Sequence, residues 1–425
     1  GQQLIAMVVG PVTARLLGAG GYGILDLCGR VSEVLRLLLA LGLPAAISRY
    51  VGIYEGEGRR DMTRGAVAGT LLISASLGLI ASAIIMLRPE WIAEGIYSKP
   101  EMATVLRIVI IGLPLGMCTG ILAPTTIARR TMIYRMITDL ISRPVTLAGI
   151  LVACWLLDYG PEGAAAAMAI NSVIIMSIFA TGVRRLIGRL SWRDLRNFEW
   201  RRLQLFALPL LLSQLAQFGL FRINSLIGGG WLTNEELGQY AAASRLALFG
   251  LFCMSVIWSM FTPIIADLHN RGKREDLRDM FQTTTRWGYM LTLPAILIAM
   301  FKAPGLLMLF GPSFPDATDA LRVLCVGQLV NVSAGPAGLL LAMSGYQWVT
   351  AANNIAMALI NIGLCVALTS RMRLMGLAGA AALATGLVNV ARGLETTLIL
   401  RITPYAWRAV KPLAAALLAC PLLLI

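Results

Sequence analysis

Apolar stretches of about 20 residues recur along the entire chain, with only short polar loops between them. A helix needs about 20 mostly apolar residues to cross the ~30 Å hydrocarbon core of a bilayer. The pattern therefore predicts an all-α polytopic membrane protein of about thirteen spans, with no room for a soluble domain. The predicted spans cover residues 1–17, 23–47, 66–87, 103–128, 136–157, 162–183, 203–228, 237–265, 282–301, 318–343, 348–369, 376–400 and 407–425.

Composition agrees with this class and argues against a soluble protein. Apolar residues make up 57% of the 425 residues and charged residues only 14%, whereas about 25% of the residues of soluble domains are charged. The formal net charge of +14 comes from basic residues that punctuate the apolar runs. A nucleic-acid-binding protein would gather such residues on one polar face, so we expect no nucleic-acid partner.

The basic residues also predict how the chain is oriented in the membrane. They concentrate in the loops that follow the second, fourth, sixth, eighth and twelfth predicted spans. An excess of lysine and arginine is typical of cytoplasmic loops, so these loops are predicted to face the cytoplasm. The region after the sixth span holds Arg184, Arg185, Arg189, Arg193, Arg196, Arg201 and Arg202.

An internal repeat predicts two similar lobes. GRRDMTR at 58–64 matches GKREDLR at 272–278, and LRIVIIG at 106–112 matches LRVLCVG at 321–327. Six predicted spans separate the matched segments, so both lobes have the same orientation, as in two-lobed transporters with a substrate site between the lobes. We predict six-helix lobes at 1–200 and 201–400 and an additional helix at 401–425, with the first and last helices truncated.

Charged residues inside the second predicted span mark a candidate site. Asp26, Arg30 and Glu33 recur at i, i+4 and i+7 and share one helical stripe, and Arg36 lies one turn beyond Glu33. A charge in hydrocarbon costs at least about 2.5–3.5 kcal/mol, so such residues normally face a polar cavity or a partner. The Asp26–Arg30 and Glu33–Arg36 spacings also permit intrahelical ion pairs, which would make part of the stripe structural.

Arginine is in excess among the charged residues of the spans. Guanidinium groups suit an anionic, bidentate ligand such as phosphate or pyrophosphate, whereas an exporter of cations would be expected to use carboxylates. Arg107, Arg143 and Arg322 could instead mark span ends and reach the headgroups. The candidate substrate-binding residues are Arg15, Asp26, Arg30, Glu33, Arg36, Arg222 and Arg245.

No constellation of catalytic residues is evident in the sequence. It contains neither a P-loop nor a Ser/His/Asp set, and its one histidine, His269, falls in a predicted cytoplasmic loop. The seven cysteines are scattered singly and form no CxxC motif, which argues against a zinc site. We therefore expect a protein that is not an enzyme and that uses neither a metal nor a cofactor.

Several segments resemble the polysaccharide-lipid flippases, which belong to a superfamily (MATE/MOP) with the MATE exporters and the lipid II flippases. They are TARLLGAGGYGILDL at 13–27, LGLPAAISRYV at 41–51, MLFGPSF at 308–314 and ITPYAWRAVKPLAAALLA at 402–419. The resemblance implies two six-helix lobes followed by extra C-terminal helices. It also implies movement of an undecaprenyl-diphosphate-linked oligosaccharide from the inner to the outer leaflet of a bacterial plasma membrane.

The resemblance also assigns roles to individual residues. Arg15 and Arg36 occupy positions expected to meet the diphosphate. Relatives commonly carry an acidic residue in the seventh span, where this chain has Asn224 in RINSLIG, so a carboxylate-based ion-coupling site is not expected there.

The expected mechanism is alternating access. Arg15, Arg30, Arg36, Arg222 and Arg245 would hold the phosphates in a cationic cavity while the prenyl tail stays in lipid. Expected partners are the lipid-linked glycan and membrane lipids, together with a polysaccharide polymerase and glycosyltransferases. Two alternatives remain open: a MATE-type cation or multidrug antiporter, and a non-transporting membrane scaffold of a cell-envelope assembly machine.

Overall fold

The computed structural model describes residues 2–129 and 131–403. Regular structure within these residues is entirely helical, which confirms the predicted all-α class. The chain divides into two compact units, Gly1–Leu215 and Ala216–Ile425. The predicted lobe boundaries at 1–200, 201–400 and 401–425 stay a prediction.

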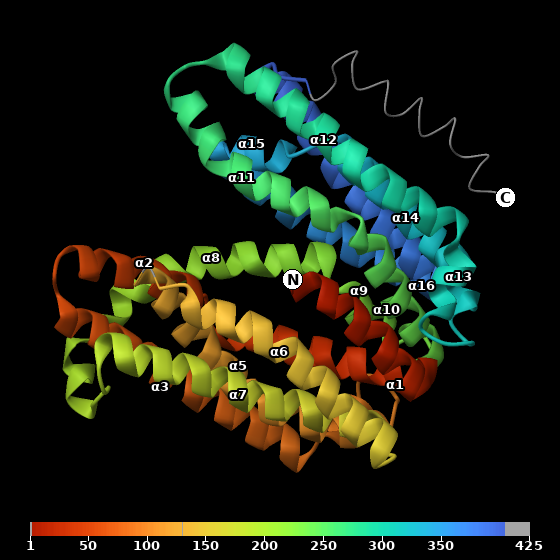
Figure 1. The fold of residues 1–425 in the computed structure, drawn as a ribbon, viewed down its shortest axis with the longest axis horizontal. Helices are drawn as coiled ribbons and strands as arrows, with labels where there is room; N and C mark the ends of the chain where they lie inside the picture. Colours follow the sequence, from red (N-terminus) through yellow and green to blue (C-terminus); the bar gives the residue numbers. More distant parts are fainter. Residues whose placement is uncertain (1, 130, 404–425) are drawn as a thin grey trace. The chain divides into compact units, whose positions relative to one another are not determined.

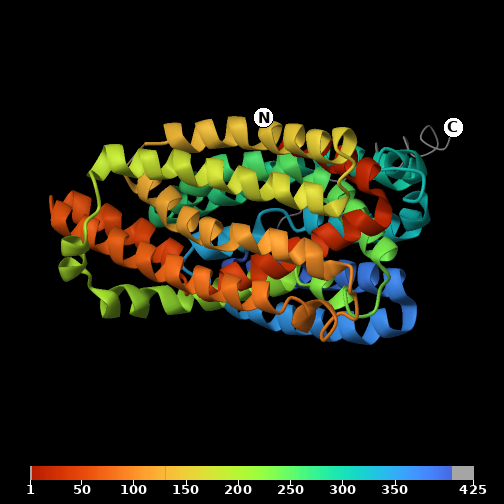
Figure 2. The same cartoon turned by 90° about the horizontal axis from the view of Figure 1, so that it is seen from below.

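The first unit is built around helix α5. Its elements are α1 (Gln2–Leu39), α2 (Leu43–Gly56), α3 (Arg60–Leu87), α4 (Glu90–Ala93), α5 (Met102–Ala128), α6 (Ile133–Ile150), η1 (Leu151–Leu156), α7 (Pro161–Ile187), η2 (Trp192–Asn197) and the first part of α8 (Trp200–Phe221). Helix α5 lies between α3 and α7 (Figure 2), and α1 packs against α5, α6 and α7. These contacts make α1, α5 and α7 neighbours around one space.

The second unit repeats much of this arrangement. Its elements after α8 are α9 (Asn224–Gly228), α10 (Asn234–Phe249), α11 (Leu251–Asn270), α12 (Arg274–Phe301), α13 (Ala303–Met308), η3 (Pro315–Ala317), α14 (Thr318–Ser333), α15 (Ala337–Met343), α16 (Gln347–Glu395) and η4 (Thr396–Leu400). Helix α14 packs against both α12 and α16 (Figure 1), as α5 packs against α3 and α7. The two helices that begin in the repeated motifs, α3 and α12, each have 28 residues.

Each unit has a core of buried apolar side chains. In the first unit a cluster joins α2, α3, α5 and α7 to the start of α8, through residues such as Ile47, Val67, Ile121, Phe179 and Leu203. In the second unit a cluster joins α11, α12, α15 and η4, through residues such as Ile265, Phe281, Leu340 and Leu400. Close packing of this kind drives helix association in membranes, where lipid removes most of the hydrophobic driving force.

The structure confirms a multi-span membrane protein, although its helices group the predicted spans differently. Seven described helices are long and apolar enough to cross a membrane, or eight if the bent pair Pro315–Ser333 and Ala337–Met343 is one span. The predicted range 1–17 and most of 23–47 share α1, and the last residues of 23–47 begin α2. The ranges 348–369 and 376–400 share α16 and the η4 turn that follows it. The ranges 237–265 and 282–301 form α10, α11 and α12, which are not among these candidates. The range 407–425 lies outside the described residues.

Two of the long helices contain a backbone break that explains this grouping. The segment Gln347–Leu400 has 54 residues, about 80 Å at 1.5 Å per residue, which is more than twice the ~30 Å hydrocarbon core. Arg373 interrupts it with φ 48° and ψ −125°, and Gly18 interrupts α1 with φ 67° and ψ 176°. Only glycine adopts the latter conformation readily, so Gly18 divides α1 into a part that carries Arg15 and a part that carries the predicted charged stripe.

Candidate functional site

The charged stripe of α1 forms a three-membered ion-pair cluster. Arg30 contacts Asp26 through Nη2 and Oδ1 at 3.4 Å, and Glu33 through Nη1 and Oε2 at 3.0 Å. The Asp26 side chain is 8% exposed, and those of Arg30 and Glu33 are 25% and 24% exposed. The Asp26–Arg30 pair permitted by the sequence spacing is therefore confirmed. Glu33 binds the same guanidinium, and the Glu33–Arg36 pair is not among the ion pairs of the described residues.

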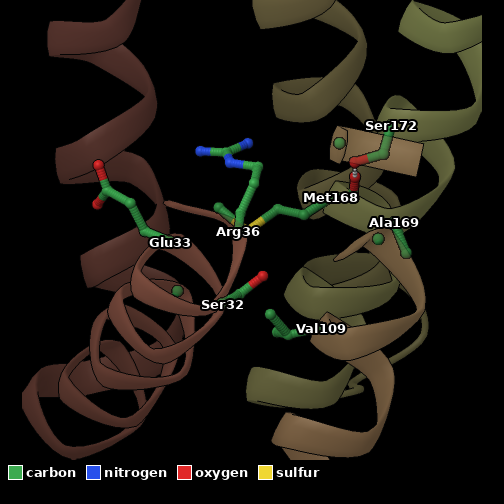
Figure 3. Close-up of a pocket in the computed structure, with 10 residues that line it drawn as sticks. Ser32, Glu33, Arg36, Val109, Met168, Ala169 and Ser172 are labelled. Carbon is green, nitrogen blue, oxygen red and sulfur yellow. Dashed lines mark hydrogen bonds between the residues drawn. The ribbon is translucent and has the colours of Figure 1, made fainter. Parts of the chain in front are cut away.

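Arg36, on the next turn of α1, lines an open pocket of about 160 Å³ and is itself exposed. In Figure 3 its side chain stands between Glu33 on one side and Met168 and Ser172 of α7 on the other. The cavity is lined by Gly29, Ser32, Glu33, Arg36, Val109, Gly112, Gly116, Met168, Ala169 and Ser172. Three helices that are distant in sequence, α1, α5 and α7, thus build one small polar space within the first unit.

Glycines of α5 make room for the Arg36 side chain. A Cβ atom at Gly116 would lie 3.3 Å from Nη1 and 3.4 Å from Cδ of Arg36. A Cβ atom at Gly112 would lie 3.4 Å from Oγ of Ser172. Sequence reasoning missed these glycines and both serines, although small residues four positions apart in an apolar helix are a recognised sign of close helix packing.

The other predicted site residues lie elsewhere. Arg15 is exposed on the part of α1 that precedes Gly18, and it does not line the cavity. Arg222 and Arg245 belong to the second unit, where both are exposed, just after α8 and on α10 respectively. The structure therefore brings together Asp26, Arg30, Glu33 and Arg36, and leaves the other three as a prediction.

Two of the arginines considered as span-end residues are paired near helix ends. Arg107 binds Glu90 at 2.8 Å, and Arg322 binds Asp319 at 3.1 Å, with every one of these side chains well exposed. These contacts favour a role at the membrane surface over a role in a buried site.

The second unit contains buried amide groups that sequence reasoning did not single out. Asn361 on α16 donates through Nδ2 to the carbonyl oxygens of Gly219 and Leu220 at 2.9 and 3.2 Å, and to Oδ1 of Asn224 at 3.0 Å. Asn361 and Asn224 are both buried. Asn224, at the position where relatives commonly carry an acidic residue, is thus half of a neutral amide pair.

A second polar group joins the beginning of α16 to its end. Arg392 donates through Nη2 to Oδ1 of Asn354 at 2.6 Å, and Asn353 donates to Glu395 at 2.5 Å. The described residues contain no group of three or more histidine, cysteine, aspartate and glutamate side chains that could hold a metal ion.

Comparisons with families of known proteins identify two matches. The family described as "Polysaccharide biosynthesis protein" matches residues 1–269, and the family described as "MatE" matches residues 209–367. No curated protein matches the chain.

Solved structures resemble the chain over nearly its whole length. A multidrug resistance MATE family transporter of the MOP superfamily in its inward-facing conformation matches with a TM-score of 0.81 and 16% identity, over 94% of this chain and 95% of that one. Its outward-facing counterpart matches with a TM-score of 0.63 and 17% identity, over 94% and 92%.

A third solved structure matches with a lower TM-score. A MOP superfamily transporter from Pyrococcus furiosus, described as having a binding pocket of reversed polarity, has a TM-score of 0.57 and 16% identity, over 94% of this chain and 98% of that one. At these identities the likeness shows the fold alone, and it confirms the predicted MATE/MOP fold.

Proposed function

Because the chain belongs to the polysaccharide biosynthesis protein family, we propose that it moves an undecaprenyl-diphosphate-linked oligosaccharide across a membrane by alternating access. Family and fold together identify a transporter and not an enzyme. The proposed direction is from the inner to the outer leaflet of a bacterial plasma membrane. The observation that carries the proposal is the exposed Arg36 guanidinium at the pocket of the first unit.

Arg36 provides a positive charge that the neighbouring side chains do not neutralise directly. Within the part of the chain that the structure describes, Arg36 has no ion-pair partner, whereas Arg30 engages both nearby carboxylates. A guanidinium group in a membrane span is costly unless an anion or water accompanies it. Its planar array of donors matches a phosphate oxygen pair, so an anionic group of the substrate would stabilise this arrangement.

The size of the cavity supports recognition of the phosphates and not of the sugars. A pocket of about 160 Å³ accommodates a group the size of a phosphate, and an oligosaccharide would extend beyond it. The hydroxyl groups of Ser32 and Ser172, which line the cavity, add neutral hydrogen-bonding groups beside Arg36.

The ion pairs of Arg30 argue against a site for organic cations. Such a site needs a carboxylate whose charge is available to the ligand. Both Asp26 and Glu33 are bound to Arg30, so each carboxylate already has a cationic partner, although one guanidinium balances only one of the two negative charges. This observation favours the lipid-linked glycan over the cationic drug of the antiporter alternative.

The proposed substrate also implies the neighbouring steps. A glycosyltransferase must complete the glycan on the prenyl diphosphate before it is moved, and a polymerase or transferase must consume it on the other side. We propose these enzymes as functional partners of this protein.

The proposal is tested with the full chain reconstituted in vesicles that contain an undecaprenyl-diphosphate-linked oligosaccharide. A lectin added outside reports the fraction of glycan that reaches the outer leaflet. The Arg36→Gln variant should lose most of this movement, and Arg36→Lys should retain part of it because the charge remains. Arg88→Gln, which removes an exposed arginine of a loop, is the matched control and should match the parent chain.

Two results would overturn the proposal. The first is an Arg36→Gln variant that moves the glycan at the parent rate. The second is a parent chain that moves no glycan but exports a cationic dye under an ion gradient, which would establish the antiporter alternative.

A further inference from the structure

The segment that connects α7 to α8 contains one short 3₁₀ helix, η2 (Trp192–Asn197). Residues three apart eclipse each other in a 3₁₀ helix, so η2 presents three stripes. One stripe is apolar (Trp192 and Leu195), one is basic (Arg193 and Arg196), and one is polar (Asp194 and Asn197).

The polar stripe is fixed to α3. Arg64 binds Oδ2 of Asp194 at 3.2 Å and also donates to the carbonyl oxygen of Arg189 at 2.6 Å. A Cβ atom at Gly65 would lie only 2.6 Å from the carbonyl oxygen of Asn197, so the backbone of η2 rests directly on α3. Next to this contact, a Cβ atom at Gly69 would overlap the ring of Phe198. The rest of the element is therefore held in a fixed orientation.

The other two stripes are presented outward. Trp192 is 77% exposed, and Arg193 and Arg196 are both exposed. The acidic side chains of this segment are occupied, Asp194 by Arg64 and Glu199 by Tyr54 and Arg202. Among the described residues no ion pair engages Arg193 or Arg196, so the outer surface of η2 combines an exposed indole with positive charge.

The length of the connection keeps this surface close to the bilayer. Trp192 follows the end of the candidate span Pro161–Ile187 by a few residues, and the next candidate span begins at Trp200. At about 3.4 Å per extended residue, Trp192 lies within roughly 17 Å of the preceding span. Tryptophan is enriched at the level of the headgroups, and basic clusters next to spans attract anionic lipids.

We infer that η2 is a docking surface for anionic phospholipid headgroups, in which Arg193 and Arg196 bind lipid phosphates and Trp192 enters the interface between headgroups and acyl chains. An acidic soluble protein would satisfy the arginines but would leave the apolar stripe without a partner. A lipid surface satisfies both stripes at once, and it is present within reach of a segment bounded by two spans.

The test uses the full chain in vesicles that contain phosphatidylcholine and phosphatidylglycerol, with bromine on the acyl chains of one lipid at a time. Subtracting the fluorescence of Trp192→Phe isolates the signal of Trp192 from that of the other tryptophans. Brominated phosphatidylglycerol should quench this signal more than the same amount of brominated phosphatidylcholine. The Arg193→Gln/Arg196→Gln double variant should lower the preference by about fivefold per arginine.

Matched variants separate lipid recognition from a general loss of charge. Arg88→Gln/Arg371→Gln removes two exposed arginines elsewhere, one just after α3 and one within α16, and should leave the preference unchanged. Gly65→Ala keeps both arginines of η2 but pushes the element off α3, so it should reduce the preference. Added inorganic phosphate at constant ionic strength should not compete, because the surface recognises a lipid and not a free ion.

Several outcomes would overturn the inference. They are equal quenching by both lipids, an unchanged preference in the Arg193→Gln/Arg196→Gln variant, and displacement by inorganic phosphate. Quenching of Trp192 by aqueous acrylamide but by neither lipid would also overturn it, and would point to a soluble acidic partner.

Discussion

Arg373 binds both carboxylate oxygens of Glu236, with Nε 2.8 Å from Oε1 and Nη2 2.6 Å from Oε2. This bidentate pair joins the first turn of α10 to the break in α16. Arg373 has φ 48°, a backbone conformation that residues other than glycine rarely adopt. Glu236 also accepts a hydrogen bond from the backbone N–H of Thr233 at 2.8 Å, as the partner in a capping box. The ion pair therefore holds a strained backbone position in place.

Replacing Arg373 should separate the ion pair from the backbone strain. Both Arg373→Ala and Arg373→Gly remove the pair, but glycine tolerates a positive φ. Arg373→Ala should therefore lower the free energy of unfolding by about 1 kcal/mol more than Arg373→Gly. Thermal unfolding of the protein in detergent measures this difference, and an alanine variant at least as stable as the glycine variant would contradict the account.

Acidification should weaken the contact at Glu236. Burial alone would raise the pKa of this carboxyl, but the hydrogen bonds from Arg373 and Thr233 prevail and hold the pKa below its usual value. A carboxylate with a depressed pKa stabilises the folded state above its unfolded pKa of about 4.3, and this stabilisation is lost as the pH falls through the folded value.

The Tm difference between the parent chain and Glu236→Gln should therefore be largest near neutral pH and shrink below about pH 4. Glu235→Gln, at the exposed neighbouring position, is the matched control. A Tm difference that stays constant from pH 7 to the acid limit of solubility would show that the carboxylate charge does not contribute.

Enlarging Gly116 should impair substrate movement without unfolding the protein. Alanine at this position brings a Cβ atom to 3.3 Å from an Arg36 nitrogen, which forces the flexible guanidinium to shift. Because misplacement of a binding group by a fraction of an ångström weakens its function, glycan movement should fall roughly three- to tenfold. Gly120→Ala is the control, since its Cβ atom would lie at an ordinary 3.6 Å from Pro44. Equal rates for the two variants would argue against a role for the Arg36 position.

Removing the Asn361 amide should destabilise the second unit. Its Nδ2 group donates hydrogen bonds to the carbonyl oxygens of Gly219 and Leu220 and to Oδ1 of Asn224. Asn361→Ala leaves these buried acceptors without their donor, at a cost of about 1–3 kcal/mol. Asn331→Ala removes only a contact with Gln328 in the same helix and should cost less than about 0.5 kcal/mol. Chemical denaturation compares the two, and similar losses would contradict this interpretation.

The sequence alone predicts the helical class and the charged stripe, because both depend on local periodicity. Asp26, Arg30 and Glu33 lie on one stripe of a single helix, and their spacing is sufficient to predict the Asp26–Arg30 pair. The sequence pairs Glu33 with Arg36, whereas the structure pairs it with Arg30. The cavity at Arg36 could not be predicted in the same way. Its walls come from Gly112 and Gly116 on α5 and from Ser172 on α7, and periodicity within one segment does not specify which helices become neighbours.

The two helix breaks show the same distinction. The break at Gly18 falls in a glycine-rich segment, GAGGYG, where a positive φ is readily accepted. The break at Arg373 has no such local signal. It is accompanied instead by a tertiary contact with Glu236, which is far away in the sequence. The sequence nevertheless predicts a span on either side of Arg373, since apolar length is a local property.

We propose that this protein moves a lipid-linked glycan by means of Arg36. The most direct measurement is the amount of prenyl-diphosphate oligosaccharide on the cytoplasmic leaflet of cells that are depleted of the protein and supplied with the Arg36→Gln or the Arg88→Gln variant. We predict that the glycan accumulates with Arg36→Gln and returns to its normal level with Arg88→Gln. Normal glycan levels in the depleted cells, together with retention of cationic dyes, would contradict the claim and favour the antiporter.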